Sequence, residues 1–183
     1  MNKLTRALTV LALGCLMTGC SPSSPATPTP VATSESVTTA TPTPQWTDEQ
    51  QAAIDAVQNY LQVWASIGQD PQGSDWAAIR TVASDPSANN AVSTWMQWAQ
   101  AGHHLVGAPQ FIPDYVTPGS TDDQGDRYHV HGCYIITDSY LADDAGNRVG
   151  VRGADRKPAL YLVLHMTTGD YLVLEDTSEE GTC

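Results

Sequence analysis

The stretch from Arg127 to Leu141 reads RYHVHGCYIITDSYL, and it decides the class of fold. It is rich in aromatic and β-branched residues, which are typical of strands. Further strands are expected at Leu160–Met166 and Tyr171–Glu175, with a turn at Thr167–Asp170 between them. Another turn is expected at Asp143–Asn147. Strands joined by short turns predict an antiparallel sheet.

The residues just before this stretch are less regular. Leu105–Pro113 is expected to be an extended segment that is broken near Pro109 and Pro113, because proline cannot donate a hydrogen bond to a sheet. Thr117–Gly125 is rich in polar residues and glycine, which predicts a loop.

The chain before the sheet has the pattern of helices. Thr47 and Gln50 form a capping-box pattern at the start of the first helix. Its apolar residues at helical spacing are Ile54, Val57, Leu61 and Trp64, and its expected end is Gly68. Ser74 is the expected cap of a short second helix, and a third is expected from Pro86 to just before Gly102. About three helices followed by an antiparallel sheet is an α+β architecture, with the helices packed on a curved sheet.

The N-terminal residues have the pattern of a targeting signal. Lys3 and Arg6 precede the apolar run Ala7–Met17, which is too short to span a bilayer, and small residues then lead to Cys20. A buried core helix is the alternative for this run, but the basic residues before it favour a signal.

This pattern resembles a bacterial lipoprotein signal, with Met17 at a position that is usually leucine. The resemblance implies that residues 1–19 are a signal peptide and that Cys20 carries the lipid, as palmitate and related chains. Cys15 is a second candidate for lipidation, with a shorter apolar run before it. The expected location is the extracytoplasmic face of the cell membrane; without lipidation the chain would be secreted.

A spacer follows the signal. Eighteen of the twenty-five residues from Ser21 to Gln45 are Ser, Thr or Pro. Such a segment cannot bury enough apolar surface to fold, so residues 20–45 are expected to be a disordered linker. Residues 46–183 are then a single domain of ordinary size.

The charge of the chain restricts its partners. Its formal net charge is −12, and removal of the signal would leave six basic and twenty acidic residues, or −14. Nucleic acids and anionic lipid headgroups require clusters of Lys and Arg, so neither is expected to bind.

Cys133 and Cys183 are expected to form a disulfide. They are the two cysteines that remain outside the predicted signal and lipid site, and such pairs are commonly oxidised to disulfides in exported proteins. A catalytic thiol is the alternative, but neither cysteine stands in a local Cys/His motif.

The strand-rich half resembles the nuclear-transport-factor-2-like superfamily, also called SnoaL-like or ketosteroid-isomerase-like. The segments that carry the resemblance are Tyr128–Cys133, Asp143–Gly146, Tyr161–His165, Gly169–Val173 and Gly181–Cys183. Actinobacterial lipoproteins of this type look similar. The resemblance implies a cone, in which a long N-terminal helix packs across a curved sheet. It does not fix a function, because the superfamily contains isomerases, dehydratases, hydrolases and non-enzymatic modules.

Histidines give a weak candidate metal site. His129 and His131 are two residues apart on one predicted strand, so their side chains share a face. With His165 on a neighbouring strand they would supply three nitrogens to a metal ion. The alternative is a polar stripe at the rim of the sheet, and no metal or cofactor is expected.

The resemblance also implies candidates for acid and base chemistry. Histidine and aspartate lining the cone do this work in the dehydratases and hydrolases of the superfamily, which makes His104, Tyr134 and Asp138 weak catalytic candidates. Alternatively, His104 interacts with the end of the third helix, where a partly cationic imidazole is favoured.

We therefore expect a membrane-anchored binding or accessory module of the cell envelope rather than an enzyme. Its partner would be an envelope protein or a small apolar ligand. The alternative is a cone-pocket enzyme of isomerase, dehydratase or hydrolase type. The sequence shows no nucleophile elbow and no phosphate-binding glycine loop.

Overall fold

The computed structural model describes residues 46–150 and 155–183. The predicted signal peptide, both candidate lipidation cysteines and the spacer lie outside the described residues. No helix within the described part combines the length and the apolar character that crossing a bilayer requires.

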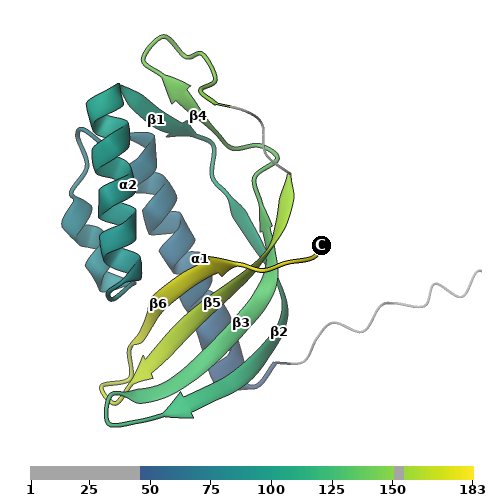
Figure 1. The fold of residues 1–183 in the computed structure, drawn as a ribbon. Coiled ribbons are helices and arrows are strands. Elements are labelled where there is room, and N and C mark those ends of the chain that lie inside the picture. The colour runs from purple at the N-terminus through teal and green to yellow at the C-terminus, as the bar shows by residue number, and fades with distance from the viewer. Residues whose placement is uncertain (1–45, 151–154) are drawn as a thin grey trace, which may run out of the picture. The chain divides into compact units, whose positions relative to one another are not determined.

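The described residues form helices packed on antiparallel sheets. In chain order the elements are α1 (Asp48–Gln69), the 3-10 helix η1 (Trp76–Thr81), α2 (Ser87–Ala101), β1 (His103–Val106), β2 (Gln110–Thr121), β3 (Gly125–Ile135), β4 (Tyr140–Asp143), β5 (Arg156–Met166) and β6 (Tyr171–Ser178). A four-stranded sheet has the order β2-β3-β5-β6, and β1 pairs with β4 in a separate two-stranded sheet. Figure 1 shows the helices along one side of the twisted larger sheet, which does not close into a barrel. The predicted α+β class is confirmed.

Three predicted elements differ from the structure. The second helix is a 3-10 helix rather than an α-helix. The predicted polar loop over Thr117–Gly125 is wrong, because β2 continues to Thr121 and pairs there with Asp126. Arg127–Leu141 is not one strand: β3 ends at Ile135, and the chain turns before β4 enters the smaller sheet. The backbone N–H of Ser139 donates to the carbonyl of Ile136 at 3.2 Å in that turn.

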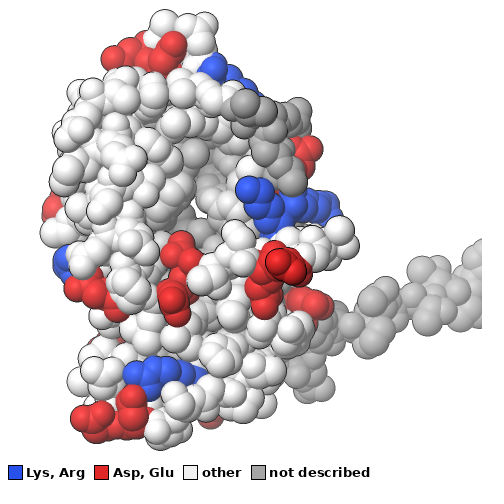
Figure 2. Space-filling view, viewed as in Figure 1, with Lys and Arg blue, Asp and Glu red and all other residues white. Residues whose placement is uncertain are grey.

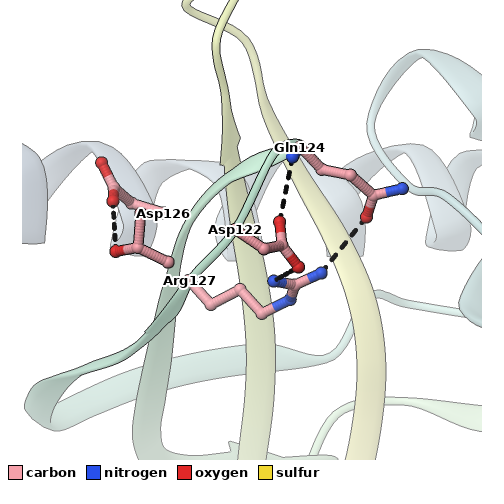
Figure 3. A network of polar contacts seen from close by, with 5 residues as sticks. Asp122, Gln124, Asp126 and Arg127 are labelled. Carbon is pink, nitrogen blue, oxygen red and sulfur yellow. Dashed lines mark hydrogen bonds and ion pairs between the residues drawn. The ribbon is translucent and has the colours of Figure 1, made fainter.

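Polar side chains hold the end of the β2–β3 hairpin, which is why residues that predicted a loop continue a strand (Figure 3). Asp122 accepts from the backbone N–H of Gln124 at 3.0 Å and forms an ion pair with Arg127. The Arg127 guanidinium also donates to the Gln124 side chain at 3.2 Å, and Thr121 donates to Asp126 at 2.7 Å. The hydrogen bond from Arg127 lowers the pKa of the Asp122 carboxyl.

The start of α1 is joined to the sheet. Thr47 accepts from the backbone N–H of Gln50 at 3.2 Å, and the Gln50 side chain accepts from the backbone N–H of Thr47 at 3.0 Å. The predicted capping box is therefore confirmed. The Gln50 amide also donates to the carbonyl of Val116 on β2 at 3.2 Å, which fixes the helix start against that strand.

The core lies between the helices and one face of the sheet. Its fully buried residues include Ile54, Val57, Trp95, Val130, Val163 and Val173. The end of α1 fits closely against α2: a Cβ on Gly68 would lie 3.1 Å from the ring of Trp98. We expected Gly68 to end the helix, but it lies inside α1, which continues to Gln69. Gly102 ends α2 with a φ of 66°, a left-handed conformation that favours glycine.

Strand register divides the side chains of the sheet between its two faces. Val130 pairs with Val116 on one side and Tyr161 on the other, and these residues face the helices. Neighbouring residues alternate, so Cys133 lies on the outer face with its partners Ile112 and Pro158. The disulfide between Cys133 and Cys183, confirmed by the structure, therefore holds the C-terminus against the outer face.

Loss of this disulfide is expected to destabilise the domain. The bridge joins cysteines 50 residues apart, and its removal restores the conformational freedom of that loop in the unfolded chain. Cys183→Ser should lower the free energy of unfolding by about 2–5 kcal/mol, measured by urea denaturation. Reduced wild-type protein is the matched control and should unfold at a similar urea concentration. An unchanged free energy in both samples would contradict the expectation.

Candidate functional site

A cavity of about 280 Å³ lies between the helices and the inner face of the sheet. Its walls come from α1, α2, β3, β5 and β6, and they include Tyr60, Trp64, Ala91, Tyr134, Ala159 and Tyr161. The space-filling view shows a hollow between the helices and the sheet (Figure 2). This volume is just below the usual range for small-molecule sites, so it suits a small ligand.

One end of the cavity is organised around the hydroxyl of Tyr60. This hydroxyl donates to the Asp176 carboxylate at 3.2 Å and accepts from the Ser87 hydroxyl at 3.1 Å. Tyr60 is 1% exposed and Ser87 is fully buried, so the hydrogen bond between them is shielded from water, whereas the one to Asp176 is only partly buried. They join α1, the first residue of α2 and β6 at one point.

Two other tyrosines offer free hydroxyl groups to the cavity. Within the described residues, no protein group is hydrogen bonded to the side chain of Tyr134 or Tyr161, and both rings line the cavity. Among the described side chains, Nε1 of Trp95 is the only polar atom that is both inaccessible to solvent and without a hydrogen-bond partner. The Tyr161 hydroxyl also lacks a partner, so it must be accessible to solvent. Because Tyr161 is only 3% exposed and lines the cavity, we infer that its hydroxyl is accessible from the cavity.

These tyrosines are protonated at neutral pH, and burial extends the protonated form to higher pH. It raises the pKa of Tyr60 and of Tyr161, and together with the charge of Asp176 it raises the pKa of Tyr134 to about 12. All three phenols are therefore neutral hydrogen-bond donors at neutral pH. Asp176 is exposed at the rim, yet its cavity side is desolvated enough to raise its pKa, and this effect exceeds the opposing effect of the Tyr60 hydrogen bond.

A lysine stands at the other end of the cavity. Lys157 lines it and pairs in register with Tyr134, whereas Tyr161 pairs with Asp176. Lys157 makes no ion pair with any other described residue. Figure 2 shows basic side chains to one side of the hollow and acidic side chains below it.

The predicted acid and base residues are not brought together. Tyr134 lines the cavity. His104 is on β1, paired with Ala142 in the smaller sheet, and Asp138 is exposed in the turn before β4. Neither His104 nor Asp138 is among the residues that line the cavity.

The three candidate metal ligands are not brought together, because the sheet separates them. His129 and His131 share the outer face, with ring centroids 6.4 Å apart. His131 is paired with Glu179 at 3.1 Å and stacks on Tyr115. His165 pairs with Asp126, which alternation places on the inner face. Across the described residues no group of three potential ligands is suitably placed for a metal ion.

Sequence reasoning missed most of the residues that define this cavity. Tyr60 lies among the apolar positions of α1, where a buried hydroxyl needs a polar partner, and this signal was available. The alternation of Lys157, Ala159 and Tyr161 on β5 was a second signal, since it places them on one face. Nothing local identifies Asp176, which is 116 residues from the tyrosine that it contacts.

Comparison with known proteins supports the fold only. No family model and no curated protein matches the chain. Among solved structures, the intermembrane-space region of the chloroplast protein ARC6 has 16% identity and a TM-score of 0.54, over 75% of this chain and 100% of that one. At this identity the likeness shows a shared fold and nothing more.

Two structures from Catenulispora acidiphila are more distant. One has 12% identity and a TM-score of 0.39, over 70% of this chain and 92% of that one. The other, in complex with S-DNPA, has 10% identity and a TM-score of 0.40, over 71% and 94%.

The tyrosines predict loss of stability at alkaline pH. A phenol whose pKa is raised on folding stabilises the folded state below its unfolded pKa, and this contribution is lost as the pH rises toward the folded pKa. The free energy of unfolding should therefore fall from pH 10, the ordinary value for tyrosine, toward pH 12, where Tyr134 titrates.

Tyr134→Phe tests this expectation, because it removes the phenol and should make the decline shallower between pH 10 and pH 12. Urea denaturation at several pH values measures the slope. Tyr115→Phe, which removes an exposed tyrosine from the outer face, is the matched control. An identical slope in Tyr134→Phe and wild type would be inconsistent with a raised pKa at this site.

Proposed function

We propose that this protein is a non-catalytic small-molecule-binding module of the cell envelope, tethered to the extracytoplasmic face of the membrane through lipidated Cys20. The cavity beside Tyr60, Tyr134 and Tyr161 is the observation that carries the binding role. Aromatic walls and a few convergent polar groups are typical of sites for small ligands. The Cys133–Cys183 disulfide agrees with an oxidising location outside the cytoplasm. We also propose that the domain belongs to the nuclear-transport-factor-2-like superfamily, since its helices pack on an antiparallel sheet.

Filling the cavity should abolish binding without unfolding the domain. Ala159→Leu places a larger side chain on the cavity floor, whereas Thr117→Leu makes a comparable apolar addition on the exposed outer face. We expect compounds that raise the Tm of wild type in a fragment screen to raise that of Thr117→Leu equally, and to have no effect on Ala159→Leu. The thermal-shift result should be repeated by ligand-observed NMR.

Hits that stabilise Ala159→Leu as strongly as wild type would place the ligand elsewhere. A screen without any wild-type hit would count against the binding role and would favour an envelope protein as the partner.

The membrane anchor has its own test. Cys20→Ala should move the mature protein from the membrane fraction to the soluble fraction, because the lipid chains supply the affinity for the bilayer. Cys15→Ala is the matched control and should leave the protein on the membrane. Mass spectrometry of the wild-type protein should find a lipidated N-terminal Cys20. Release by Cys15→Ala alone, or an unmodified N-terminus at another residue, would contradict lipidation at Cys20.

One observation favours the enzyme alternative. Asp176 is a carboxyl group with a raised pKa, beside a tyrosine hydroxyl and at the edge of a cavity, which is the setting of many general bases. An isomerase, dehydratase or hydrolase would convert a bound ligand, and NMR would detect the product. Asp176→Asn should stop that conversion while preserving an acceptor for Tyr60. A ligand that stays unchanged after prolonged incubation with wild type supports the binding module.

A further inference from the structure

We propose that the cavity selects an elongated small molecule with a cationic amine at one end, a carboxylate at the other and an apolar or aromatic middle. The amine would bind Asp176, and the carboxylate would bind Lys157. This inference rests on the proposed function, because it names the ligand class of the same cavity.

Strand register measures the distance between the two ends. Lys157 and Tyr161 are on the same face of β5, four residues apart, and Tyr161 is directly opposite Asp176 on β6. Four residues of strand span roughly 13 Å, at about 3.3 Å each. The Lys157 side chain is long enough to shorten this gap but not to remove it, and an ion pair between Lys157 and Asp176 is absent. Opposite charges are therefore held apart across the cavity, with room for a ligand between them.

The hydrogen-bonding groups at each end differ in kind. At the Lys157 end, the ammonium group is a charged donor, so it suits a carboxylate. At the other end, Asp176 accepts one hydrogen bond from Tyr60 through Oδ2, which leaves its remaining acceptor capacity for a ligand donor. A ligand that satisfies both ends carries opposite charges on a spacer.

The middle of the cavity combines small apolar side chains and an aromatic wall with Ser178, which lies opposite Ala159 in register. Ala159 lies between Lys157 and Tyr161 on the floor, and Trp64 and Ala91 contribute to the helix side. The small side chains of the two alanines leave the space open. Aromatic faces attract an amine or stack on a flat ring, so the Trp64 side favours a ligand with an aromatic spacer.

The test uses 4-(aminomethyl)benzoate and two analogues that each lack one charge, benzylamine and benzoate, with toluene as the neutral probe. Dissociation constants are measured by NMR titration. Charged hydrogen bonds are typically worth enough that the doubly charged probe should bind about tenfold more tightly than either analogue. Asp176→Asn should weaken the probes that carry an amine about tenfold and leave benzoate unchanged. Lys157→Gln should weaken the probes that carry a carboxylate about tenfold and leave benzylamine unchanged.

Two neighbouring residues provide matched controls, because they are exposed, lie on the opposite face and undergo the same change of charge. Arg156→Gln controls for Lys157→Gln, and Glu175→Gln controls for Asp176→Asn. Neither control should change any of the dissociation constants. Equal effects of a control and its partner would mean that long-range charge, and not the cavity, sets the affinity, and would overturn the inference.

The remaining outcomes separate this inference from the proposed function. If toluene binds as tightly as the charged probes and Ala159→Leu abolishes all binding, the binding role stands and the charge selection is wrong. If none of these probes binds while the fragment screen gives hits that Ala159→Leu abolishes, the ligand class is wrong and the binding role again stands. If neither set binds, both fail.

Discussion

The buried hydroxyl of Tyr60 is the constraint on which the arrangement of this domain depends. Tyr60 is on the apolar face of α1, and leaving its hydroxyl unpaired there would cost about 1–3 kcal/mol. Its partners come from the first residue of α2 and from β6, at 3.1 Å to Ser87 and 3.2 Å to Asp176. The same contacts therefore satisfy the hydroxyl and fix where two other elements lie. They also define the acidic end of the cavity, so the stability of the core and the chemistry of the site share one set of atoms.

The alternation of strand residues separates structural from functional groups. On the inner face, Val130 and Val163 complete the core, while Ala159 is too small to reach the helices and leaves the cavity open. On the outer face, the pair of His131 with Glu179 lies near the disulfide that holds the C-terminal residues. Each sheet edge is protected in its own way: β2 carries prolines, and β6 pairs with the chain at Ala83.

Local patterns predicted the elements better than their ends. Helical spacing identified α1 and α2, and β-branched and aromatic runs identified the strands. The break between β3 and β4 was missed because Ile135 and Tyr140 both favour strands, and only the pairing of Tyr140 with Val106 in another sheet separates them. Gly68 was taken for a helix end, but its role is to let the ring of Trp98 approach α1, which depends on tertiary packing. The site was less predictable still: Tyr134 was identified, but the contact between Tyr60 and Asp176 joins residues that no local spacing connects.

The acidity of the chain and the chemistry of its cavity act over different distances. A formal charge of −12 repels anions in general, but at physiological salt this effect is screened beyond about 8 Å. Lys157 and Asp176 are exposed at the rim, but a ligand in the cavity would contact them well within this distance, so their charges would outweigh the net charge of the chain. The phenols are protonated across the physiological pH range, and burial raises their pKa further, so these donors do not depend on pH there. A ligand with both charges is repelled less by the acidic surface than a simple anion, and only such a ligand uses both ends of the cavity.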